Sequence, residues 1–406
     1  MTESAAAPTK HALAIDGQRV LIDATAMPPQ LGGVGRYLEG LLQGFETIGF
    51  HPWVVAKPAH VRYFRKIAPS ARYLRSSSWL TLRGGRFLWE QTFLPKLARE
   101  IGADIIHSPH YTFPLNFEGG RVVTIHDATV MTDPQTHSRT KARFFSWWLA
   151  RGYREDITLV APSHATADEV TGSIGEPKNP VQVVYHGVDA ETFCEPSADD
   201  IEAFRQAVGL KPGQPWIAFL GTIEPRKQVP DLIRAHAKLT AEDPTTPVLL
   251  IGGQRGWDLE AIHMLDQKPD RVIELGYLEL EQLRALLGGS EFVVYASLAE
   301  GFGLPVLEAM QCGAAVITTR STSLPEVGGD VAAYVDGTGV DALAATMRHL
   351  LDDEDERRER AEAGPGRAAE FTWTRAAIGH LEAYALEAKR RERARSSGAA
   401  SSRARR

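Results

Sequence analysis

Short apolar runs rich in valine and isoleucine alternate with longer helical patterns along most of this 406-residue chain. Glycine, proline or aspartate bounds each run, which is typical of buried parallel strands in β–α units. The runs form two series, at 19–24, 52–57, 103–108, 121–127, 157–163 and 181–187, and then at 216–222, 247–253, 271–277, 291–297 and 314–319. Because the pattern breaks around 190–215, the sequence predicts two doubly wound α/β domains.

The length of the chain agrees with two domains, since a typical domain has roughly 100–200 residues. We expect a flexible N-terminus and a basic tail to flank the two domains and a C-terminal helix that returns to the first domain. The predicted bounds are 1–18 for the N-terminus, 19–200 and 201–372 for the domains, 373–394 for the helix and 395–406 for a disordered tail.

Composition excludes several classes of protein. The net charge is −6, yet eight basic residues and one acid gather in 389–406, so the rest of the chain is acidic. Nucleic-acid binding needs clustered positive charge on the fold itself and is not expected. Cys194 and Cys312 lie far apart without a CxxC spacing, which argues against a disulfide framework or a cysteine metal site and fits a reducing cytoplasm.

The chain shows no pattern for export or for crossing a membrane. The N-terminus lacks a basic segment followed by an apolar core, and no apolar run reaches the ~20 residues that span a bilayer. We expect a cytoplasmic protein, either free or peripheral on the inner face of the plasma membrane. The basic tail could give only a weak electrostatic anchor to anionic lipid.

The stretch YASLAEGFGLPVLEAMQCGAAVITT, residues 295–319, carries the strongest site signal. A strand precedes a glycine-rich turn, Pro305 suits the first turn of a helix, and Gly313 can end that helix. The helix therefore begins at Leu304 and offers its free N–H groups to a phosphate.

Two glutamates flank this turn. Glu300 lies on the approaching loop and Glu308 in the early turns of the helix. Ionised carboxylates accept hydrogen bonds from the vicinal hydroxyls of a ribose or hexose. The alternative is that both acids merely favour a helix N-terminus. The combination with a strand, a glycine pair and Pro305 favours a binding site.

Three further segments place polar residues or glycines after predicted strands. In FLGTIEPRKQVPDLIRA, Arg226 and Lys227 could neutralise a diphosphate, or they could be a solvated charge pair. In QLGGVGRYLEGLL, Gly32 and Gly33 allow either close approach to a ligand or a tight turn. In VVTIHDATVM, His126 is either a packed structural residue or a hydrogen-bond donor to a sugar.

A metal site is not expected. The DDED run at 352–355 contains a DxD pattern, but its highly charged surroundings indicate an exposed helix. Serine hydrolysis is not expected either, because the chain has no GxSxG motif to complete a triad with His126.

EGFGLPVLE, followed by AMQCGAAVI and SLPEVGGDVAAYVD, resembles the retaining glycosyltransferases of family 4, over about 19–390. The resemblance implies the GT-B fold, with two facing Rossmann-like domains and a cleft between them. Glu300 and Glu308 match the paired glutamates that contact hydroxyls of the sugar and the ribose. The resemblance implies that the remaining donor-binding residues include Gly32, Gly33, Gly301, Phe302, Gly303 and Leu304.

The resemblance also assigns roles to the other motifs. Lys227 matches the phosphate-binding lysine, and His126 lies near the hydroxyls of the transferred sugar. Thr222, a donor-binding position, stands where many relatives carry arginine, so Arg226 would supply the second charge. This GTIEPRK pattern is similar to a bacterial branch with many mannosyltransferases, which favours GDP-mannose as the donor.

The resemblance implies that the protein transfers a hexose from a nucleotide diphosphate sugar to a hydroxyl acceptor with retention of the anomeric configuration. Mannose is the favoured hexose, and the reaction would belong to glycan, polysaccharide or glycolipid biosynthesis. No cofactor and no metal are expected. The alternatives are another GT-B enzyme, such as a sugar-nucleotide epimerase or phosphorylase, and a non-catalytic nucleotide-sugar-binding protein.

The segment SRTKARFFSWWLARGYR, residues 138–154, bears on the acceptor. On a helix, Phe144, Trp147, Trp148 and Arg151 share one stripe with Lys141 at its start. The helix is either a core helix with a solvated basic side or an interfacial helix that meets anionic lipid and a lipid-linked acceptor.

Overall fold

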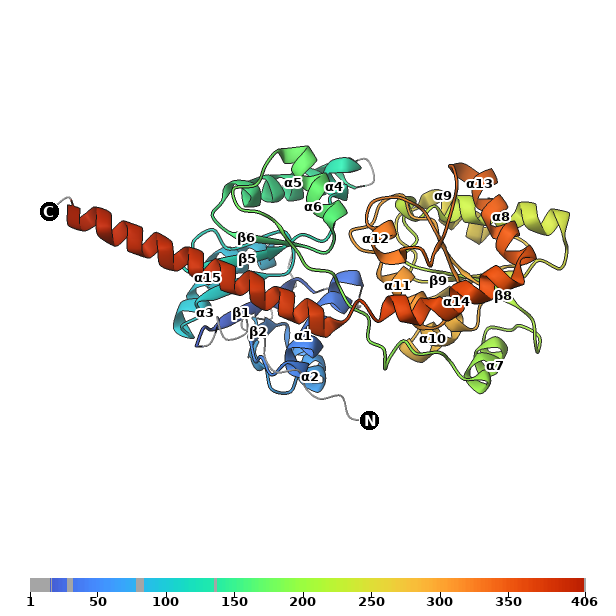
Figure 1. The fold of residues 1–406 in the computed structure, drawn as a ribbon, viewed down its shortest axis with the longest axis horizontal. Helices are drawn as coiled ribbons and strands as arrows, with labels where there is room; N and C mark the ends of the chain where they lie inside the picture. Colours follow the sequence, from blue (N-terminus) through green and yellow to red (C-terminus); the bar gives the residue numbers. More distant parts are fainter. Residues whose placement is uncertain (1–14, 16, 28–31, 78–83, 135–136, 405–406) are drawn as a thin grey trace. The chain divides into compact units, whose positions relative to one another are not determined.

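The computed structural model describes residues 15, 17–27, 32–77, 84–134 and 137–404, with side chains to residue 396 (Figure 1). Most of the segment predicted to be flexible, 1–18, lies outside the described residues. The chain divides into two compact units, unit 1 with Met1–Gly187 and Trp373–Arg406, and unit 2 with Val188–Thr372.

The predicted domain boundary at 200/201 is too late. Arg284 of unit 2 donates to Cys194 at 3.3 Å and pairs with Asp200 at 3.1 Å, so the chain already packs on unit 2 before residue 200. The proline- and acid-rich composition of this segment indicated a linker, whereas its side chains make tertiary contacts.

Unit 1 contains a parallel sheet of seven strands among the described residues. From one edge to the other the strands are β3 (Arg72–Arg75), β2 (Trp53–Ala56), β1 (Val20–Asp23), β4 (Ile105–Ser108), β5 (Gly120–Thr124), β6 (Thr158–Ala161) and β7 (Gln182–Val183). The order reverses direction between β1 and β4, which is the topological switch point of a doubly wound sheet.

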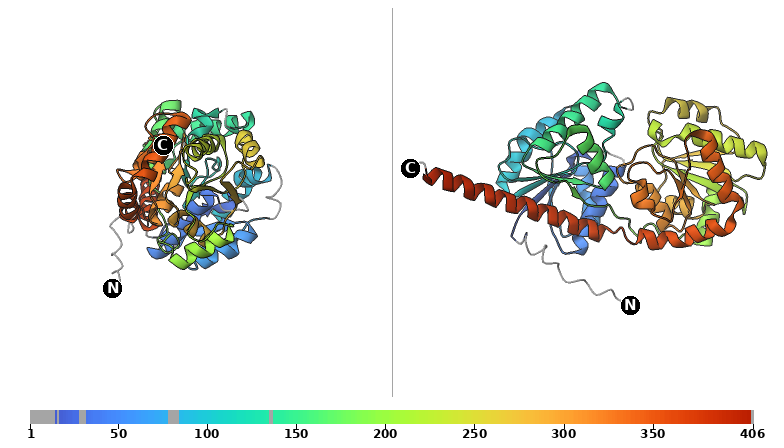
Figure 2. Two further views of the ribbon diagram at one scale, coloured as in Figure 1. Left: turned by 90° about the vertical axis from the view of Figure 1, so that its right-hand side faces the viewer. Right: turned by 45° about the horizontal axis from the view of Figure 1, so that its top comes forward.

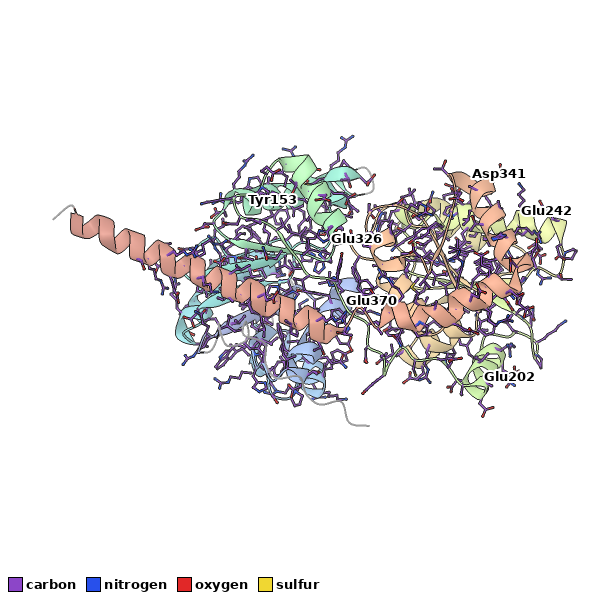
Figure 3. The ribbon with its side chains drawn as sticks, in the orientation of Figure 1. Tyr153, Glu202, Glu242, Glu326, Asp341 and Glu370 are labelled. Carbon is purple, nitrogen blue, oxygen red and sulfur yellow. The ribbon has the colours of Figure 1, made fainter. Side chains whose placement is uncertain are left out.

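Helices pack around this sheet (Figures 1 and 2). They are α1 (Gly33–Thr47), α2 (Pro58–Ile67), α3 (Gly85–Glu100), α4 (Thr129–Thr132), α5 (Arg139–Arg154), α6 (His164–Ile174) and α15 (Trp373–Ala404), with a 3₁₀ turn η2 (Ala24–Ala26). Tyr153 of α5, labelled in Figure 3, is one of the buried aromatic residues of the core.

Helix α15 belongs to unit 1 and starts at Trp373, the predicted residue. It packs along α1, where a Cβ on Gly40 would overlap the Trp373 indole. The Tyr37 hydroxyl lies 2.7 Å from Nε2 of His380, and buried Glu387 accepts hydrogen bonds from Arg121 and Thr158 of the sheet.

The helix does not end where the sequence predicted. It continues to Ala404, whereas residues 395–406 were predicted to be disordered. Arg and Ala make up half of 395–404 and have high intrinsic helix propensity, which favours continuation of the helix through the four serines and the glycine among them.

Unit 2 contains a parallel sheet of six strands among the described residues, in the order β10 (Val272–Gly276), β9 (Val248–Gly252), β8 (Trp216–Leu220), β11 (Val293–Tyr295), β12 (Val316–Thr318) and β13 (Ala333–Tyr334). Its switch point lies between β8 and β11. The helices are α7 (Ala198–Ala207), α8 (Val229–Glu242), α9 (Leu259–Asp266), α10 (Leu280–Gly288), α11 (Leu304–Gln311), α12 (Leu324–Gly328), α13 (Gly339–Asp352) and α14 (Glu354–Ala368), with a 3₁₀ turn η5 (Pro225–Lys227).

Alternate strand residues of unit 2 face opposite layers. Phe219 and Ile251 join the core beneath α8 and α13, whereas Trp216 donates its indole N–H to the carbonyl of Leu286 on α10. Helices therefore cover both faces of the sheet, and the loops lie at the ends of its strands. The acids labelled on the outside of this unit, Glu202, Glu242 and Asp341, each pair with a nearby Arg or Lys (Figure 3).

Candidate functional site

The glycine turn of unit 2 has the predicted geometry. Gly303 has φ +106°, and a Cβ there would lie 2.9 Å from Leu324 Cδ2, so this position requires glycine. Helix α11 begins at Leu304 with Pro305 in its first turn, and Gly313 follows its end with φ +75°. The predicted helix start is confirmed and follows the carboxyl end of β11. Pro305 has no N–H, and the N–H groups of Val306 and Leu307 bond to the Gly303 carbonyl at 3.0 and 3.3 Å, so within the described residues the Leu304 N–H is the donor of this turn that remains for a ligand.

A second loop reaches the same edge of the sheet. Strand β8 leads into η5, and Gln228 with φ +53° turns the chain into α8. Because β8 and β11 are neighbours at the switch point, their loops place the cations after β8 beside the carboxylate after β11.

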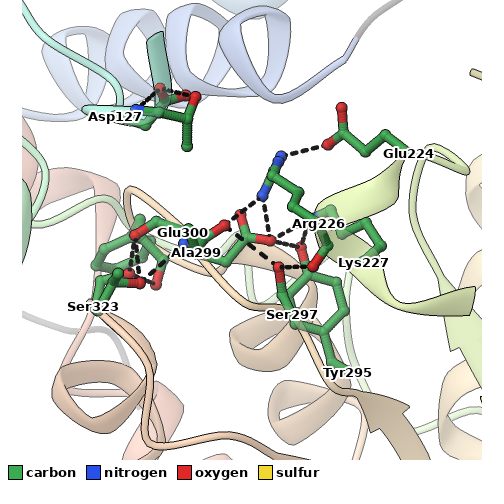
Figure 4. Close-up of polar contacts among 12 residues, drawn as sticks. Asp127, Glu224, Arg226, Lys227, Tyr295, Ser297, Ala299, Glu300 and Ser323 are labelled. Atoms are coloured by element: carbon green, nitrogen blue, oxygen red, sulfur yellow. Dashed lines mark hydrogen bonds and ion pairs between the residues drawn. The ribbon is translucent and has the colours of Figure 1, made fainter. Parts of the chain in front are cut away.

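Glu300 is the centre of a buried polar cluster (Figure 4). Its Oε1 accepts a hydrogen bond from the Tyr295 hydroxyl at 2.8 Å, contacts the Lys227 ammonium, and lies 2.5 Å from Nη1 of Arg226. The Lys227 ammonium also contacts the Tyr295 hydroxyl and lies 4.3 Å from the centre of that ring. The sequence predicted that Arg226, Lys227 and Glu300 share one site, and the structure brings them together.

Arg226 is fixed from two further directions. It donates to the carbonyl of Ala299 at 2.7 Å and pairs with Glu224 at 2.5 Å, which Figure 4 shows on the opposite side of the guanidinium from Glu300. The backbone of Glu300 is fixed too, since Ser323 donates to its carbonyl at 2.8 Å. The loops therefore hold both charged groups in defined positions before any ligand binds.

The cluster controls the protonation of its members. Burial opposes ionisation of Glu300, but Lys227 and Arg226 outweigh that effect and hold the pKa of Glu300 below its ordinary value. Burial lowers the pKa of Lys227 to about 8, although Glu300 favours the ammonium form. Glu300 thus remains a carboxylate at neutral pH, and Lys227 remains largely charged only with that carboxylate beside it.

The other predicted donor-binding residues of unit 2 differ in exposure. Gly301, Phe302 and Glu308 are buried, Leu304 is half-buried, and Thr222 is exposed after β8. Glu308 lies on α11, one turn beyond its start, as predicted. Its assignment to a ribose stays a prediction.

The predicted residues of unit 1 lie at the carboxyl ends of its strands. His126 follows β5, and its Nε2 is 2.7 Å from the carbonyl oxygen of Pro109. Burial lowers the pKa of His126, and the hydrogen bond to Pro109 offsets only part of that shift. A neutral ring donates its single N–H to Pro109, so a sugar hydroxyl could meet His126 only at the acceptor nitrogen Nδ1 rather than at the predicted donor.

Gly32 caps α1, and Gly33 is its first residue. A Cβ built on either would meet no described atom within 4 Å. The described fold does not itself require glycine at these two positions, so close approach by a ligand stays the predicted reason for them.

Three side chains that build this cluster were not predicted. Tyr295 occupies an apolar position in the strand pattern of β11, and Glu224 stood unassigned inside the GTIEPRK segment. Ser323 lies 23 residues beyond the Glu300 carbonyl that it binds, and no local pattern signals such a contact. For Tyr295 the available signal was its place at the carboxyl end of a central strand.

The aromatic segment of unit 1 forms helix α5, as predicted, but its aromatic residues divide between two environments. Trp148 is 1% exposed and packs on Phe113 with ring centres 4.9 Å apart, so its assignment to an interfacial stripe is wrong. Phe144 and Trp147 are 39% and 51% exposed, and Phe144 lies 5.6 Å from the exposed ring of Phe87 on α3. No helix among the described residues is long and apolar enough to cross a membrane.

One group of potential metal ligands occurs within the described part of the chain. Atoms of His349, Asp353 and Glu356 lie within 4.8 Å of one another. They already serve other contacts, since His349 pairs with Glu356 at 2.7 Å and Asp353 caps α14. This group overlaps the DDED run that the sequence assigned to an exposed helix.

The two doubly wound units define a GT-B protein, and solved structures of that class share the fold. The Anabaena protein Alr3699/HepE in complex with UDP-glucose superposes with a TM-score of 0.70 at 18% identity, over 91% of this chain and 99% of that chain. WaaG, a glycosyltransferase involved in lipopolysaccharide biosynthesis, superposes with a TM-score of 0.67 at 16% identity, over 86% and 95%.

The chain belongs to the glycosyltransferases of group 1 and family 4. Residues 200–367 match the family model described as Glycosyl transferases group 1, and residues 31–192 match the model described as Glycosyltransferase Family 4. The resemblance of the glycine-turn motif is thereby confirmed at the level of the family.

Curated relatives carry more specific names. The O-antigen chain mannosyltransferase B of Escherichia coli is 28% identical over 70% of this chain and 74% of its own length. The D-inositol 3-phosphate glycosyltransferase of Mycolicibacterium smegmatis is 32% identical over 56% of this chain and 52% of its own. The serotype-specific mannosyltransferase WbdA of Escherichia coli is 30% identical over 68% and 35%. The chain thus spans about half or less of the last two.

Proposed function

We propose that this protein transfers mannose from GDP-mannose to a hydroxyl of a growing glycan with retention of the anomeric configuration and without a metal ion. The observation that carries the proposal is the cluster of Arg226, Lys227, Tyr295 and Glu300 at the carboxyl ends of β8 and β11, next to the start of α11. Two relatives named as mannosyltransferases support mannose as the transferred sugar.

The donor diphosphate binds where positive charge is prearranged. Its oxygens accept hydrogen bonds from Arg226, from Lys227 and from the Leu304 N–H at the start of α11. In the structure the two cations already pair with Glu300, so the diphosphate takes them over from that carboxylate. Glu300 is then available for the hydroxyls of the mannose, and Glu308 for those of the ribose.

The bond between the anomeric carbon and the diphosphate oxygen breaks, and its electron pair stays on the leaving phosphate. The acceptor hydroxyl attacks the same face of the oxocarbenium-like sugar, and its proton passes to the leaving phosphate oxygen. Negative charge grows on the diphosphate in this step, and Arg226, Lys227 and α11 stabilise it. These groups supply the positive charge that a divalent metal provides in other transferases.

The acceptor is carried by a lipid, and the enzyme meets it at an anionic membrane surface. The exposed rings of Phe87, Phe144 and Trp147 are of the kind that sits at the headgroup level of a bilayer. Three exposed cations lie on α5 in the residues just before Phe144, namely Arg139, Lys141 and Arg143. Anionic lipid attracts such cations by about 1 kcal/mol each near the surface.

The experiment is a panel of nucleotide sugars, read out as release of nucleoside diphosphate with and without candidate acceptors. GDP-mannose should give release that depends on an acceptor, and the product should keep the α configuration of the donor in its NMR spectrum. Isomerisation of the donor without acceptor would identify an epimerase instead. Donor binding without turnover on any acceptor would identify a non-catalytic binding protein.

A further inference from the structure

The geometry points to a binding subsite for a neutral, polyhydroxylated sugar of the acceptor in unit 1, built by Asp23, Arg86 and Glu90 at the switch point between β1 and β4. This inference rests on the proposed function, since it names the part of the acceptor that unit 1 recognises. We refer to these three residues as the acceptor subsite.

The acceptor subsite occupies the place where doubly wound sheets bind ligands. Asp23 is the last residue of β1 and Ser108 the last of β4, and the register pairs the residues just before them, Ile22 with His107. Asp23 and Ser108 therefore lie at the carboxyl ends of two neighbouring parallel strands, at the switch point of the sheet. Ligands of such sheets bind outside the carboxyl ends of the strands at this crevice.

Two carboxylates share one guanidinium there. Asp23 is 1% exposed and Glu90 0%. Arg86 lies 3.6 Å from Asp23 Oδ2 and 3.1 Å from Glu90 Oε2. Thr112 donates to Glu90 Oε2 at 2.7 Å, and Thr25 donates to Asp23 Oδ1 at 2.6 Å. One oxygen of each carboxylate, Oε2 of Glu90 and Oδ1 of Asp23, thereby accepts a hydrogen bond from the fold.

The other half of each carboxylate lacks a hydrogen-bond partner. Asp23 Oδ2 and Glu90 Oε1 are buried and accept no hydrogen bond from any residue that the structure describes. Within the same described residues, Ser108 Oγ and Arg86 Nε are also buried without a partner. A buried polar atom without a partner costs about 1–3 kcal/mol, so four at one edge of a sheet require an explanation beyond the fold itself.

Arg86 gives a ligand access to this cluster. Its side chain keeps 25% of its surface exposed while the two carboxylates beside it are buried. A flexible arginine that moves aside uncovers Asp23 Oδ2 and Glu90 Oε1, and its own guanidinium can follow the ligand as a donor.

The chemistry selects hydroxyls rather than phosphate. Carboxylate oxygens accept hydrogen bonds from vicinal hydroxyls, and a guanidinium donates back to the same hydroxyl oxygens. A phosphate would face two carboxylates, while the neighbouring Lys57 already donates to the carbonyl of Met27 at 2.8 Å. Repulsion between a phosphate and these carboxylates disfavours an anionic acceptor group at this subsite.

The test measures sugar binding to the full chain with GDP present. Methyl glycosides of mannose, glucose, galactose and N-acetylglucosamine, and inositol 3-phosphate, are titrated and observed by ligand-detected NMR. We expect at least one methyl glycoside to bind and inositol 3-phosphate not to compete with it. Asp23→Asn and Glu90→Gln should each weaken glycoside binding about ten- to hundredfold and leave GDP binding unchanged. Glu100→Gln, on the exposed end of the same helix α3, is the matched control and should change neither.

Three results would overturn the inference. They are glycoside binding by Asp23→Asn and Glu90→Gln at wild-type affinity, competition by inositol 3-phosphate at equal strength, and no binding of any methyl glycoside. Thermal unfolding of both variants shows whether a loss of binding reflects a loss of folding. If GDP-mannose gives no turnover while glycoside binding still depends on Asp23 and Glu90, the proposed function fails and the acceptor subsite stands.

Discussion

Glu90→Gln should make unit 1 more stable than the wild type above pH 7 and should not do so near pH 4.5. Burial raises the pKa of Glu90 to about 7 from an ordinary value of 4.5, Arg86 opposes that shift, and Asp23 adds to it. Between these two pH values the folded protein keeps a proton that the unfolded chain has released. The free energy of unfolding therefore falls as the pH rises through this window, and the loss due to Glu90 stays constant above it.

The magnitude follows from the difference of about 2.5 pKa units. At 1.36 kcal/mol per unit, the ionised carboxylate lowers the free energy of unfolding by about 3 kcal/mol above pH 7. Glutamine does not titrate, so the free energy of unfolding of the variant relative to the wild type should rise by about 3 kcal/mol between pH 4.5 and pH 8. Asp23→Asn removes one cause of the raised pKa of Glu90. In a chain that keeps Glu90, this substitution should therefore reduce the pH dependence of the free energy of unfolding.

The assay is native-state hydrogen exchange of peptides from β1 and α3, corrected for the pH dependence of intrinsic exchange. These peptides report on the unit that contains Glu90 rather than on the whole chain. Glu100→Gln on the same helix should leave the wild-type pH dependence unchanged. A free-energy difference between Glu90→Gln and the wild type that stays constant from pH 4.5 to pH 8 would refute the reasoning, because Glu90 would then titrate alike in the folded and unfolded chain.

Four further predictions concern the donor site and the membrane surface. Glu308→Ala should weaken donor binding about ten- to hundredfold, since a charged hydrogen-bond partner contributes about 1.5–3 kcal/mol, and calorimetry checks this. Arg226→Ala should lower kcat more than it raises the donor KM, because charge on the diphosphate grows in the transition state, and steady-state kinetics separates the two. Tyr295→Phe removes only the hydroxyl that contacts the lysine and the glutamate, and should lower kcat/KM roughly tenfold without loss of the fold. Sedimentation with anionic liposomes at low salt should disappear when three cations of α5 are changed to glutamate, Arg139, Lys141 and Arg143.

Each of these has an outcome that contradicts it. Unchanged donor affinity in Glu308→Ala would remove the ribose assignment, and a pure KM effect in Arg226→Ala would limit that residue to donor binding. Wild-type kinetics in Tyr295→Phe would make the tyrosine a packing residue. For the liposome assay the control reverses three exposed cations of α2, which carries no exposed aromatic ring among the described side chains: Arg62, Arg65 and Lys66. Equal loss of binding in this control would show a non-specific charge effect.

The sequence predicted the central strands and missed two edge strands. Buried central strands read as continuous apolar runs because helices cover both of their faces. Strand β3 lies at the edge of its sheet and reads RYLR, and β13 lies at the edge of the other sheet with two residues. RYLR and the two residues of β13 carry too little apolar sequence to differ from a loop, whereas the other two edge strands, β7 and β10, were predicted from their apolar runs.

The residues of the proposed donor site could be predicted because their sequence signals are local. Glu300, the glycine turn and the start of α11 lie within a few residues of one another, and Arg226 and Lys227 follow a strand that reads clearly as buried. The acceptor subsite was not predictable in this way. Asp23 and Glu90 are 67 positions apart, and each taken alone resembles an ordinary acid at the end of a strand or within a helix. Only the three-dimensional contact with Arg86 gives them a common role.

Under the proposed function, the effect of Glu300 on Lys227 would explain why a carboxylate lies where a diphosphate would bind. Burial alone lowers the pKa of the Lys227 ammonium, and Arg226 lowers it further, whereas Glu300 raises it and leaves it at about 8. Without that carboxylate, more of the lysine would be a neutral amine at pH 7, which attracts a phosphate only weakly. In the proposed mechanism the donor would displace Glu300 from both cations, so this ion pair would lower the affinity of the protein for the donor. As the glycosidic bond breaks, the leaving diphosphate gains charge and its attraction to Lys227 and Arg226 grows. The displaced carboxylate could then face the developing positive charge of the sugar, so in the proposed mechanism one exchange of partners would stabilise both ends of the breaking bond.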